Sequence, residues 1–308
     1  MKKILITGAS GFIGSFIVEE ALRRGLETWA AVRPTSSLRY LQDARVHLLT
    51  LDLQDPARLM DQLRPHRFDY IVHAAGATKC QDPADFFRVN RDGTRHLFQA
   101  VRALAMPVER IVFLSSLSVF GAIHETQPYT PITEADQPRP NTCYGQSKLE
   151  AEQAALESGL PVVILRPTGV YGPREHDYFM MAKSIKGHTD FAVGFQQQDI
   201  TFVYVKDVVR VNLWFWENHG PSGIYNCGTG HAHSYNEVAK AVIKAMGKGE
   251  IAYRDFPEVL KGKYQNFTES DPTHLLAAGY DQGFTDMDEA VKEYVTFLDN
   301  GGYYEYGK

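Results

Sequence analysis

The stretch Thr7-Gly8-Ala9-Ser10-Gly11-Phe12-Ile13-Gly14 lies between a short apolar run at Lys3–Thr7 and a segment with helical periodicity. Gly8 permits a tight turn, Gly11 allows backbone N–H groups to approach a pyrophosphate, and Gly14 lets helix and strand pack closely. The helix N-terminus offers further N–H groups to the phosphates. This strand–turn–helix context predicts a dinucleotide-binding loop rather than a turn that only packs. The expected cofactor contacts there are Gly8, Gly11, Phe12, Ile13 and Gly14.

Short apolar runs alternate with longer amphipathic stretches in the first half of the chain. Runs that are apolar throughout suit parallel strands covered on both faces, so the pattern predicts a Rossmann-type, doubly wound α/β sheet. Gly25, after Arg23 and Arg24, is expected to end the first helix. We expect strands at Lys3–Thr7, Glu27–Val32, Val46–Leu51, Tyr70–His73, Ile111–Leu114 and Val162–Leu165.

The alternation of apolar runs and amphipathic stretches ends near Arg166, where prolines and glycines interrupt the chain. We expect an NAD(P)-binding domain over residues 1–165. A smaller, mainly substrate-binding lobe is expected over residues 166–308, with some segments returning to the first sheet. Helical patterns in this second half lie near Tyr178–Lys186, Lys206–Asn218, Ser234–Met246 and Met287–Asn300.

Composition limits the class of protein. The 308 residues are 44% hydrophobic and 22% charged, which is ordinary for a globular chain. With 32 basic and 37 acidic residues the net charge is -5, so nucleic acid is not an expected partner. No apolar stretch approaches the ~20 residues that cross a bilayer, and no membrane is expected. Cys80, Cys143 and Cys227 are too scattered for a disulfide framework or a metal motif, which favours a reducing cytoplasm.

The residues after the second predicted strand bear on the choice of dinucleotide. A site for NAD usually places an acid there to hold the ribose hydroxyls. The sequence is instead Val32-Arg33-Pro34-Thr35-Ser36. Arg33 supplies a planar cation suited to a 2′-phosphate, and Ser36 a neutral donor, so NADP is favoured over NAD. The alternative is that Arg33 is a solvated surface residue.

Further cofactor contacts are expected at the ends of the third and fourth strands. Asp52 and Leu53 end the third strand, where a side chain can meet the adenine. The small residues Ala74, Ala75 and Gly76 let a cofactor lie close to the fourth. Asn90 precedes a predicted helix and is either a further contact or a cap residue.

Tyr144 and Lys148 are four residues apart in a helical run, so they share one helix face. A phenol titrates near ~10, and lowering its pKa by about three units requires roughly 4 kcal/mol. A unit charge 4 Å away contributes about that much at an effective dielectric constant of ~20. The sequence therefore predicts that the lysine ammonium, helped by the positive nicotinamide ring, makes Tyr144 an effective base, and that the lysine also holds the nicotinamide ribose. Alone, Tyr144 would be half-buried packing and Lys148 a solvated helix residue.

Ser115 and Ser116 follow the fifth predicted strand. This places a hydroxyl at the carboxyl end of the sheet, where open α/β folds bind ligands. Such a hydroxyl can hydrogen-bond the reacting oxygen of a sugar in both its oxidised and reduced states.

Together these motifs resemble the extended short-chain dehydrogenase/reductase superfamily, in its sugar-nucleotide epimerase/dehydratase branch. The TGxxGxxG loop matches Thr7–Gly14, the YxxxK pair matches Tyr144 and Lys148, and Arg166–Pro173 resembles the RxxxVYGP turn. The resemblance implies that Ser116 is the catalytic serine, that Pro167 and Val170 meet the cofactor, and that the protein is a homodimer.

The second half resembles the C-terminal lobe of ADP-glycero-manno-heptose 6-epimerases, which implies that Tyr264 contacts substrate. No lysine follows Gly172-Pro173-Arg174-Glu175 as it does in that family. Asp199 or Ile200 also stands where the family has a basic residue that meets the substrate.

These observations predict an NAD(P)-dependent sugar-nucleotide epimerase that oxidises a hydroxyl to a transient ketone and then reduces it. Ser116, Tyr144 and Lys148 are its expected catalytic residues. The alternatives are an NADPH-dependent ketone reductase, which uses the same three residues, and an NADP-sensing module without chemistry.

Overall fold

The computed structural model describes the chain except for residues 125–127, 176–189, 193–198, 253–266 and 301–308. The chain folds as two compact units, each built from separate stretches of sequence. The first contains Met1–Gly121, Gln137–Arg166 and Val209–Tyr225. The second contains Ala122–Asp136 and the described parts of Pro167–Val208 and Asn226–Lys308.

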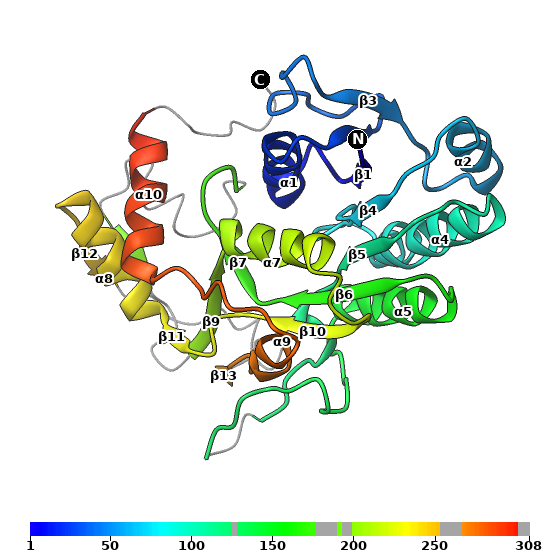
Figure 1. Cartoon of the computed structure of the whole chain (residues 1–308). Coiled ribbons are helices and arrows are strands. Elements are labelled where there is room, and N and C mark those ends of the chain that lie inside the picture. The colour runs from blue at the N-terminus through cyan, green and yellow to red at the C-terminus, as the bar shows by residue number, and fades with distance from the viewer. Residues whose placement is uncertain (125–127, 176–189, 193–198, 253–266, 301–308) are drawn as a thin grey trace. The chain divides into compact units, whose positions relative to one another are not determined.

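A seven-stranded sheet forms the centre of the first unit, in the order β10-β6-β5-β4-β1-β2-β3 (Figure 1). Six strands are parallel, and β10 (Gly223–Cys227) lies beside β6 at one edge. The parallel strands are β1 (Lys3–Thr7), β2 (Glu27–Val32), β3 (His47–Thr50), β4 (Tyr70–His73), β5 (Arg110–Leu114) and β6 (Val162–Pro167). The strand order reverses between β1 and β4, and folds of this kind bind ligands outside the strand ends at such a point.

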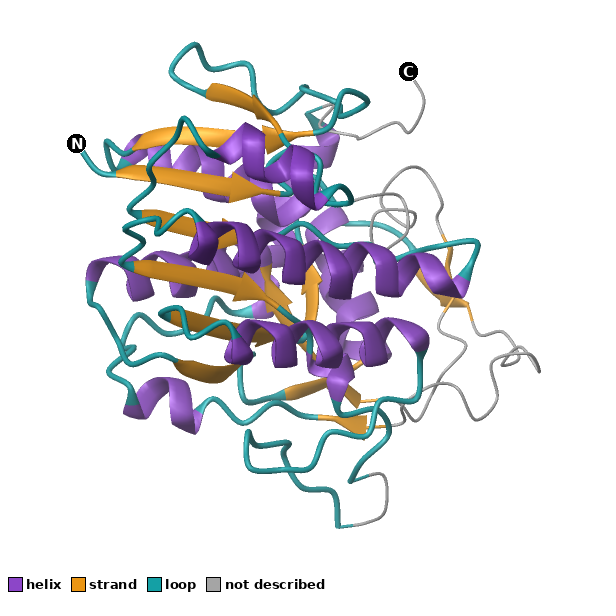
Figure 2. Cartoon of the chain, turned by 90° about the vertical axis from the view of Figure 1, so that its right-hand side faces the viewer, coloured by secondary structure: helices purple, strands orange, loops and turns teal. Residues whose placement is uncertain are grey.

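Helices cover both faces of this sheet. On one face α2 (Pro56–Leu63), α4 (Gly93–Ala103) and α5 (Cys143–Glu157) share one hydrophobic core with the strands, and Figure 2 views the molecule from that side. On the other face lie α1 (Phe12–Arg23) and the later part of α7 (Val205–Glu217), joined by an ion pair between Arg24 and Glu217. Strand residues buried from both sides explain the apolar runs in the sequence.

The predicted Rossmann-type fold is confirmed, and all six predicted strands are present. Their ends differ from the predictions by at most two residues; β3, for example, covers His47–Thr50 rather than Val46–Leu51. The sequence predicted no strand at β10, because Gly-Ile-Tyr-Asn-Cys is too mixed to read as a buried run. Helix α1 ends before Gly25, as predicted: Gly25 has a φ of 73°, and its N–H donates to Leu22 O.

The second unit is built on short strands. β9 (Asp199–Tyr204) pairs with β7 (Gly169–Tyr171), β11 (Ala232–Ser234) and β13 (Phe267–Thr268), while β8 (Asp190–Ala192) pairs with β12 (Glu250–Ala252). Helices α8 (Tyr235–Met246) and α10 (Met287–Asp299) pack together, and α9 covers Thr273–Ala277. The helices expected at 206–218, 234–246 and 287–300 are present within a few residues, whereas that at 178–186 lies outside the described residues.

No helix in the described part of the chain is both long enough and apolar enough to span a membrane.

Candidate active site

The glycine turn between β1 and α1 leaves no room for side chains. Gly8 has a φ of 68°, and a Cβ there would lie 2.6 Å from the backbone of Ala74. A Cβ at Gly14 would lie 2.1 Å from Gly8 O. Gly11 begins α1 without a side-chain cap, and the first turn of the helix carries no acid. The turn therefore presents N–H groups and the positive end of the helix dipole, which fits the pyrophosphate of a dinucleotide.

The loop after β4 lies close to the side chains of two predicted site residues, Asn90 and Lys148. A Cβ on Gly76 would lie 3.2 Å from Asn90 Oδ1 and 3.3 Å from Lys148 Nζ. The backbone N–H groups of Ala74 and Ala75 donate to the carbonyl and the hydroxyl of Thr7, both at 3.2 Å. The ends of β1 and β4 are thereby joined, and the small residues of this loop allow close approach to the turn.

Asn90 lies inside a π-helical turn, η1 (Phe87–Asp92), that joins the short α3 (Pro83–Phe86) to α4. Its side chain accepts from Ala77 N–H at 2.7 Å and donates to Ala77 O at 3.0 Å and to Ser147 Oγ at 2.9 Å. Ser147 in turn donates to Tyr144 O at 2.7 Å. Asn90 therefore does not cap a helix; it fixes the loop after β4 to the first turn of α5. Single π-turns occur frequently at functional sites.

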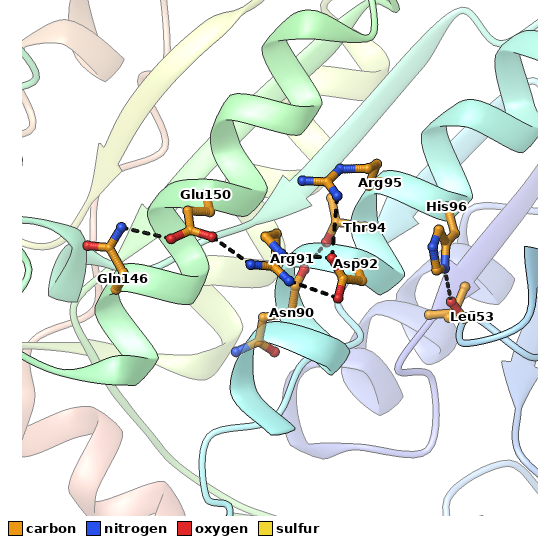
Figure 3. A network of polar contacts seen from close by, with 9 residues as sticks. All are labelled: Leu53, Asn90, Arg91, Asp92, Thr94, Arg95, His96, Gln146 and Glu150. Atoms are coloured by element: carbon orange, nitrogen blue, oxygen red, sulfur yellow. Dashed lines mark hydrogen bonds and ion pairs between the residues drawn. The ribbon is translucent and has the colours of Figure 1, made fainter. Parts of the chain in front are cut away.

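A surface network reinforces this junction (Figure 3). The guanidinium of Arg91 donates to Asp92 at 2.7 and 3.0 Å and reaches Glu150 on α5 at 3.1 Å. Glu150 also accepts from Gln146 Nε2 at 2.9 Å. The π-turn and α5 are thus linked at Asn90 and again at the neighbouring Arg91.

The predicted catalytic residues come together at the carboxyl end of β5. Ser116 follows that strand and caps the short helix η2 (Leu117–Val119) by accepting from Ser118 N–H at 3.2 Å. Tyr144, on the first turn of α5, hydrogen-bonds to the Ser116 side chain. Lys148 is buried, and its Nζ donates to Leu114 O at 2.7 Å, so it contacts the same strand end.

Burial shifts the pKa values of both Tyr144 and Lys148. Burial raises the pKa of Tyr144, and the hydrogen bond with Ser116 offsets only part of this rise. Burial lowers the pKa of Lys148 to about 8, while the charge of Glu152 raises it. The cost of removing a phenolate from water, which the sequence does not show, exceeds the opposing effect of Ser116. The joint effect of Lys148 and a bound nicotinamide on this pKa stays a prediction.

A buried ion pair lies one helical turn beyond Lys148. Glu152 accepts from Arg166 at 2.9 and 2.7 Å and from the Ser115 hydroxyl at 2.5 Å. The structure therefore separates the two serines: Ser115 binds a buried carboxylate, and Ser116 contacts Tyr144. No motif in the sequence pointed to Glu152, although its position four residues after Lys148 places it on the same helix face.

The predicted adenine-side residues lie at the ends of β2 and β3. Arg33 is exposed, and its N–H donates to Ser36 Oγ at 2.9 Å. Across the described ranges, no hydrogen bond or ion pair engages its guanidinium. Asp52 accepts from Gln54 N–H at 3.0 Å and lies 3.6 Å from Arg58, and Leu53 O contacts His96 Nδ1 at 2.8 Å. Arg33 thus presents an exposed cation that no described residue pairs, whereas Asp52 and Leu53 also order their own turn.

Three predicted residues are not placed relative to this cluster. Pro167 and Val170 belong to the second unit, at the end of β6 and in β7. Tyr264 lies outside the described residues. Their contacts stay predictions.

Comparisons with known proteins agree with this arrangement. A model of the "NAD dependent epimerase/dehydratase family" matches residues 4–228. The chain is 34% identical to the ADP-L-glycero-D-manno-heptose-6-epimerase of Alkalilimnicola ehrlichii, covering 95% of this chain and 96% of that protein.

Two solved structures extend the comparison. The Thermus thermophilus UDP-glucose 4-epimerase complex with NAD has a TM-score of 0.82 at 28% identity, covering 96% of this chain and 99% of that one. MoeE5 in complex with UDP-glucuronic acid and NAD has a TM-score of 0.84 at 26% identity, covering 97% and 99%.

Proposed function

Because this chain belongs to the NAD dependent epimerase/dehydratase family, whose members are enzymes, we propose that it is a sugar-nucleotide epimerase. It would oxidise a substrate hydroxyl to a ketone and reduce the ketone on its other face. The observation that carries this proposal is the meeting of Ser116, Tyr144 and Lys148 beside the Gly76 loop. The epimerase relative at 34% identity supports the reaction class.

A bound nicotinamide dinucleotide supplies the acceptor, and later the donor, of the hydride. Tyr144 takes the proton of the reacting hydroxyl and returns it in the second half-reaction. Ser116 already contacts the phenol and holds the same substrate oxygen. We expect Lys148 to contact the ribose, and the nearness of its Nζ to the Gly76 loop supports this role. The raised pKa of Tyr144 means that lowering it requires the positive charge of the oxidised nicotinamide in addition to that of Lys148.

We propose that Arg33 makes the protein prefer NADP, although the two solved relatives hold NAD. Its exposed guanidinium at the end of β2, which has no hydrogen-bond or ion-pair partner among the described residues, suits a 2′-phosphate. Arg33→Ala should weaken NADP⁺ binding about tenfold or more and leave NAD⁺ binding nearly unchanged, as measured by calorimetric titration. A variant that keeps the wild-type ratio of the two affinities would contradict this.

The substrate class is proposed to be a nucleotide sugar, with ADP-glycero-manno-heptose the first compound to test. Asp199 and Ile200 lie in β9, in the segment that has a basic residue in the heptose epimerases. A related sugar nucleotide is therefore included beside ADP-heptose.

The function is tested by incubating each sugar nucleotide with a small amount of oxidised cofactor and following the sugar by NMR. The proposal expects a new epimer, with the cofactor returned after each turnover. Accumulation of reduced cofactor without an epimer would contradict it. Turnover of a ketone that stops when NADPH is exhausted would instead identify a reductase.

A further inference from the structure

A buried chain of hydrogen bonds connects the glycine turn to the π-turn through His73 and Thr94. His73, at the end of β4, is fully buried. Its Nδ1 lies 2.7 Å from Thr7 Oγ1, and its Nε2 lies 2.9 Å from Thr94 Oγ1. The ring stacks on Phe113 with centroids 5.3 Å apart.

The donors in this chain can be assigned from its two ends. Thr94 Oγ1 is 2.5 Å from Asn90 O, and a carbonyl only accepts, so the Thr94 hydroxyl donates there. The Thr94 oxygen must then accept from His73, which places the ring proton on Nε2. At the other end, Thr7 Oγ1 accepts from Ala75 N–H. The Thr7 hydroxyl donates its hydrogen to the bare Nδ1.

All five groups have hydrogen-bond partners only when every donor in the chain points the same way. The chain runs from Ala75 N–H to Thr7, to His73, to Thr94 and to Asn90 O. A protonated ring would carry a second N–H facing Thr7, and the Thr7 hydrogen would lose its acceptor. Burial, with the nearby charge of Lys148, accordingly lowers the pKa of His73 to about 3.

The two ends of this hydrogen-bond chain lie at the loop proposed to approach the cofactor and near Tyr144, the proposed base. Ala75 belongs to the loop that packs on Gly8, and the Asn90 side chain reaches Ser147, which donates to Tyr144 O. We propose that His73 and Thr94 are positioning residues, with His73 fixed as the neutral Nε2–H tautomer. They hold the glycine turn and the loop after β4 in a fixed position relative to helix α5, which carries Tyr144. This rests on the proposed placement of the dinucleotide at the glycine turn.

Thr94→Val and Thr94→Ser test this proposal. Valine keeps the shape of threonine but breaks the chain at both His73 and Asn90, whereas serine keeps the hydroxyl. Thr28→Val is the matched control, because Thr28 is equally buried and its hydroxyl donates to Leu26 O at 3.0 Å, away from this chain. Thr94→Val should raise the Kd for NAD⁺ and NADP⁺ about tenfold, with Thr94→Ser and Thr28→Val near wild type. Equal Kd values for Thr94→Val and Thr28→Val would overturn the proposal.

A second measurement does not depend on the threonine variants being stable. ¹⁵N NMR of histidine-labelled wild-type protein distinguishes the two tautomers, and the His73 signal is the one missing from His73→Phe. An Nε2–H ring that stays neutral from pH 8 to pH 5 is expected. An Nδ1–H ring, or one that protonates in that interval, would overturn the proposal. Neither experiment requires turnover, so both can fail while the epimerase proposal stands, and a failed substrate screen leaves them intact.

Discussion

At the residue scale, the site depends on how a half-buried phenol acquires a negative charge. Tyr144 and Lys148 are close to the same strand end, yet burial moves both pKa values in the direction that disfavours the ion pair. The spacing in the sequence predicted which residues meet, but it could not show the desolvation that accompanies their meeting.

Tyr144→Phe should abolish turnover, because the phenyl ring has no proton to exchange, while the dinucleotide still binds. We expect kcat to fall by at least ~10³-fold, within the range for a lost acid–base group. Calorimetric titration of NAD⁺ and NADP⁺ provides the control for folding. Retention of more than a tenth of wild-type turnover would remove Tyr144 from the mechanism.

The charge of Glu152 keeps Lys148 protonated. Because this charge raises the pKa of Lys148 against burial, Glu152→Gln should lower that pKa below its value of about 8. The ammonium is then lost at lower pH, so the alkaline limb of the pH profile of kcat should move to lower pH. The variant should also lose about 3–5 kcal/mol of stability, because Arg166 is left as an unpaired buried charge.

Ser115→Ala is the control, because it removes one hydrogen bond to the same carboxylate and keeps its charge. Its pH profile should match wild type. Equal displacement of the alkaline limb in both variants would show that the charge of Glu152 is not the cause.

At the element scale, strands were easier to predict than the turns that carry the chemistry. β1, β2 and β4 lie at the predicted residues because their buried faces leave continuous apolar runs. The π-turn at Phe87–Asp92 has no such pattern, since it is fixed by contacts of Asn90 with residues far along the chain. The different roles of Ser115 and Ser116 likewise depend on helix α5, which adjacent positions in the sequence cannot reveal.

The end of β4 should make the fold sensitive to acid. His73 has a pKa of about 3 when folded, against 6.5 as its ordinary value, so the unfolded chain binds more protons below pH 6.5. The free energy of unfolding should therefore fall as the pH drops from 6.5 towards 3. Between pH 7 and 4.5 this group accounts for about 2–3 kcal/mol.

His73→Phe removes that titration, and the neighbouring Phe98 and Phe113 rings can accommodate a phenyl group. Urea unfolding should show the variant less stable than wild type at pH 7, with the gap narrowing at pH 4.5. A constant difference at the two pH values would mean that His73 does not titrate as described.

At the scale of the whole molecule, the predicted family and fold are confirmed, and the assignment of the substrate rests on the second unit. The family match covers residues 4–228 and includes all the proposed catalytic residues. Tyr264, the predicted substrate contact, lies outside the described residues. Sequence resemblance therefore supports the reaction class more firmly than the identity of the sugar.

We propose that the protein is a homodimer, as the resemblance to its superfamily implies, and that it lies in the reducing cytoplasm, which its few scattered cysteines favour. Sedimentation velocity should then give about twice the chain mass of 34.7 kDa at micromolar concentration. A single species with the mass of one chain at that concentration would contradict the dimer.

The most direct test of the central claim is a titration of Tyr144 itself. The ¹³Cζ resonances of labelled tyrosines, with Tyr144 assigned by its absence from Tyr144→Phe, report the ionisation of the phenol. Without cofactor the pKa should lie above 10.0, as burial dictates. With saturating oxidised dinucleotide it should fall by about two units or more. A phenol that keeps its high pKa in the complex would contradict the assignment of Tyr144 as the base.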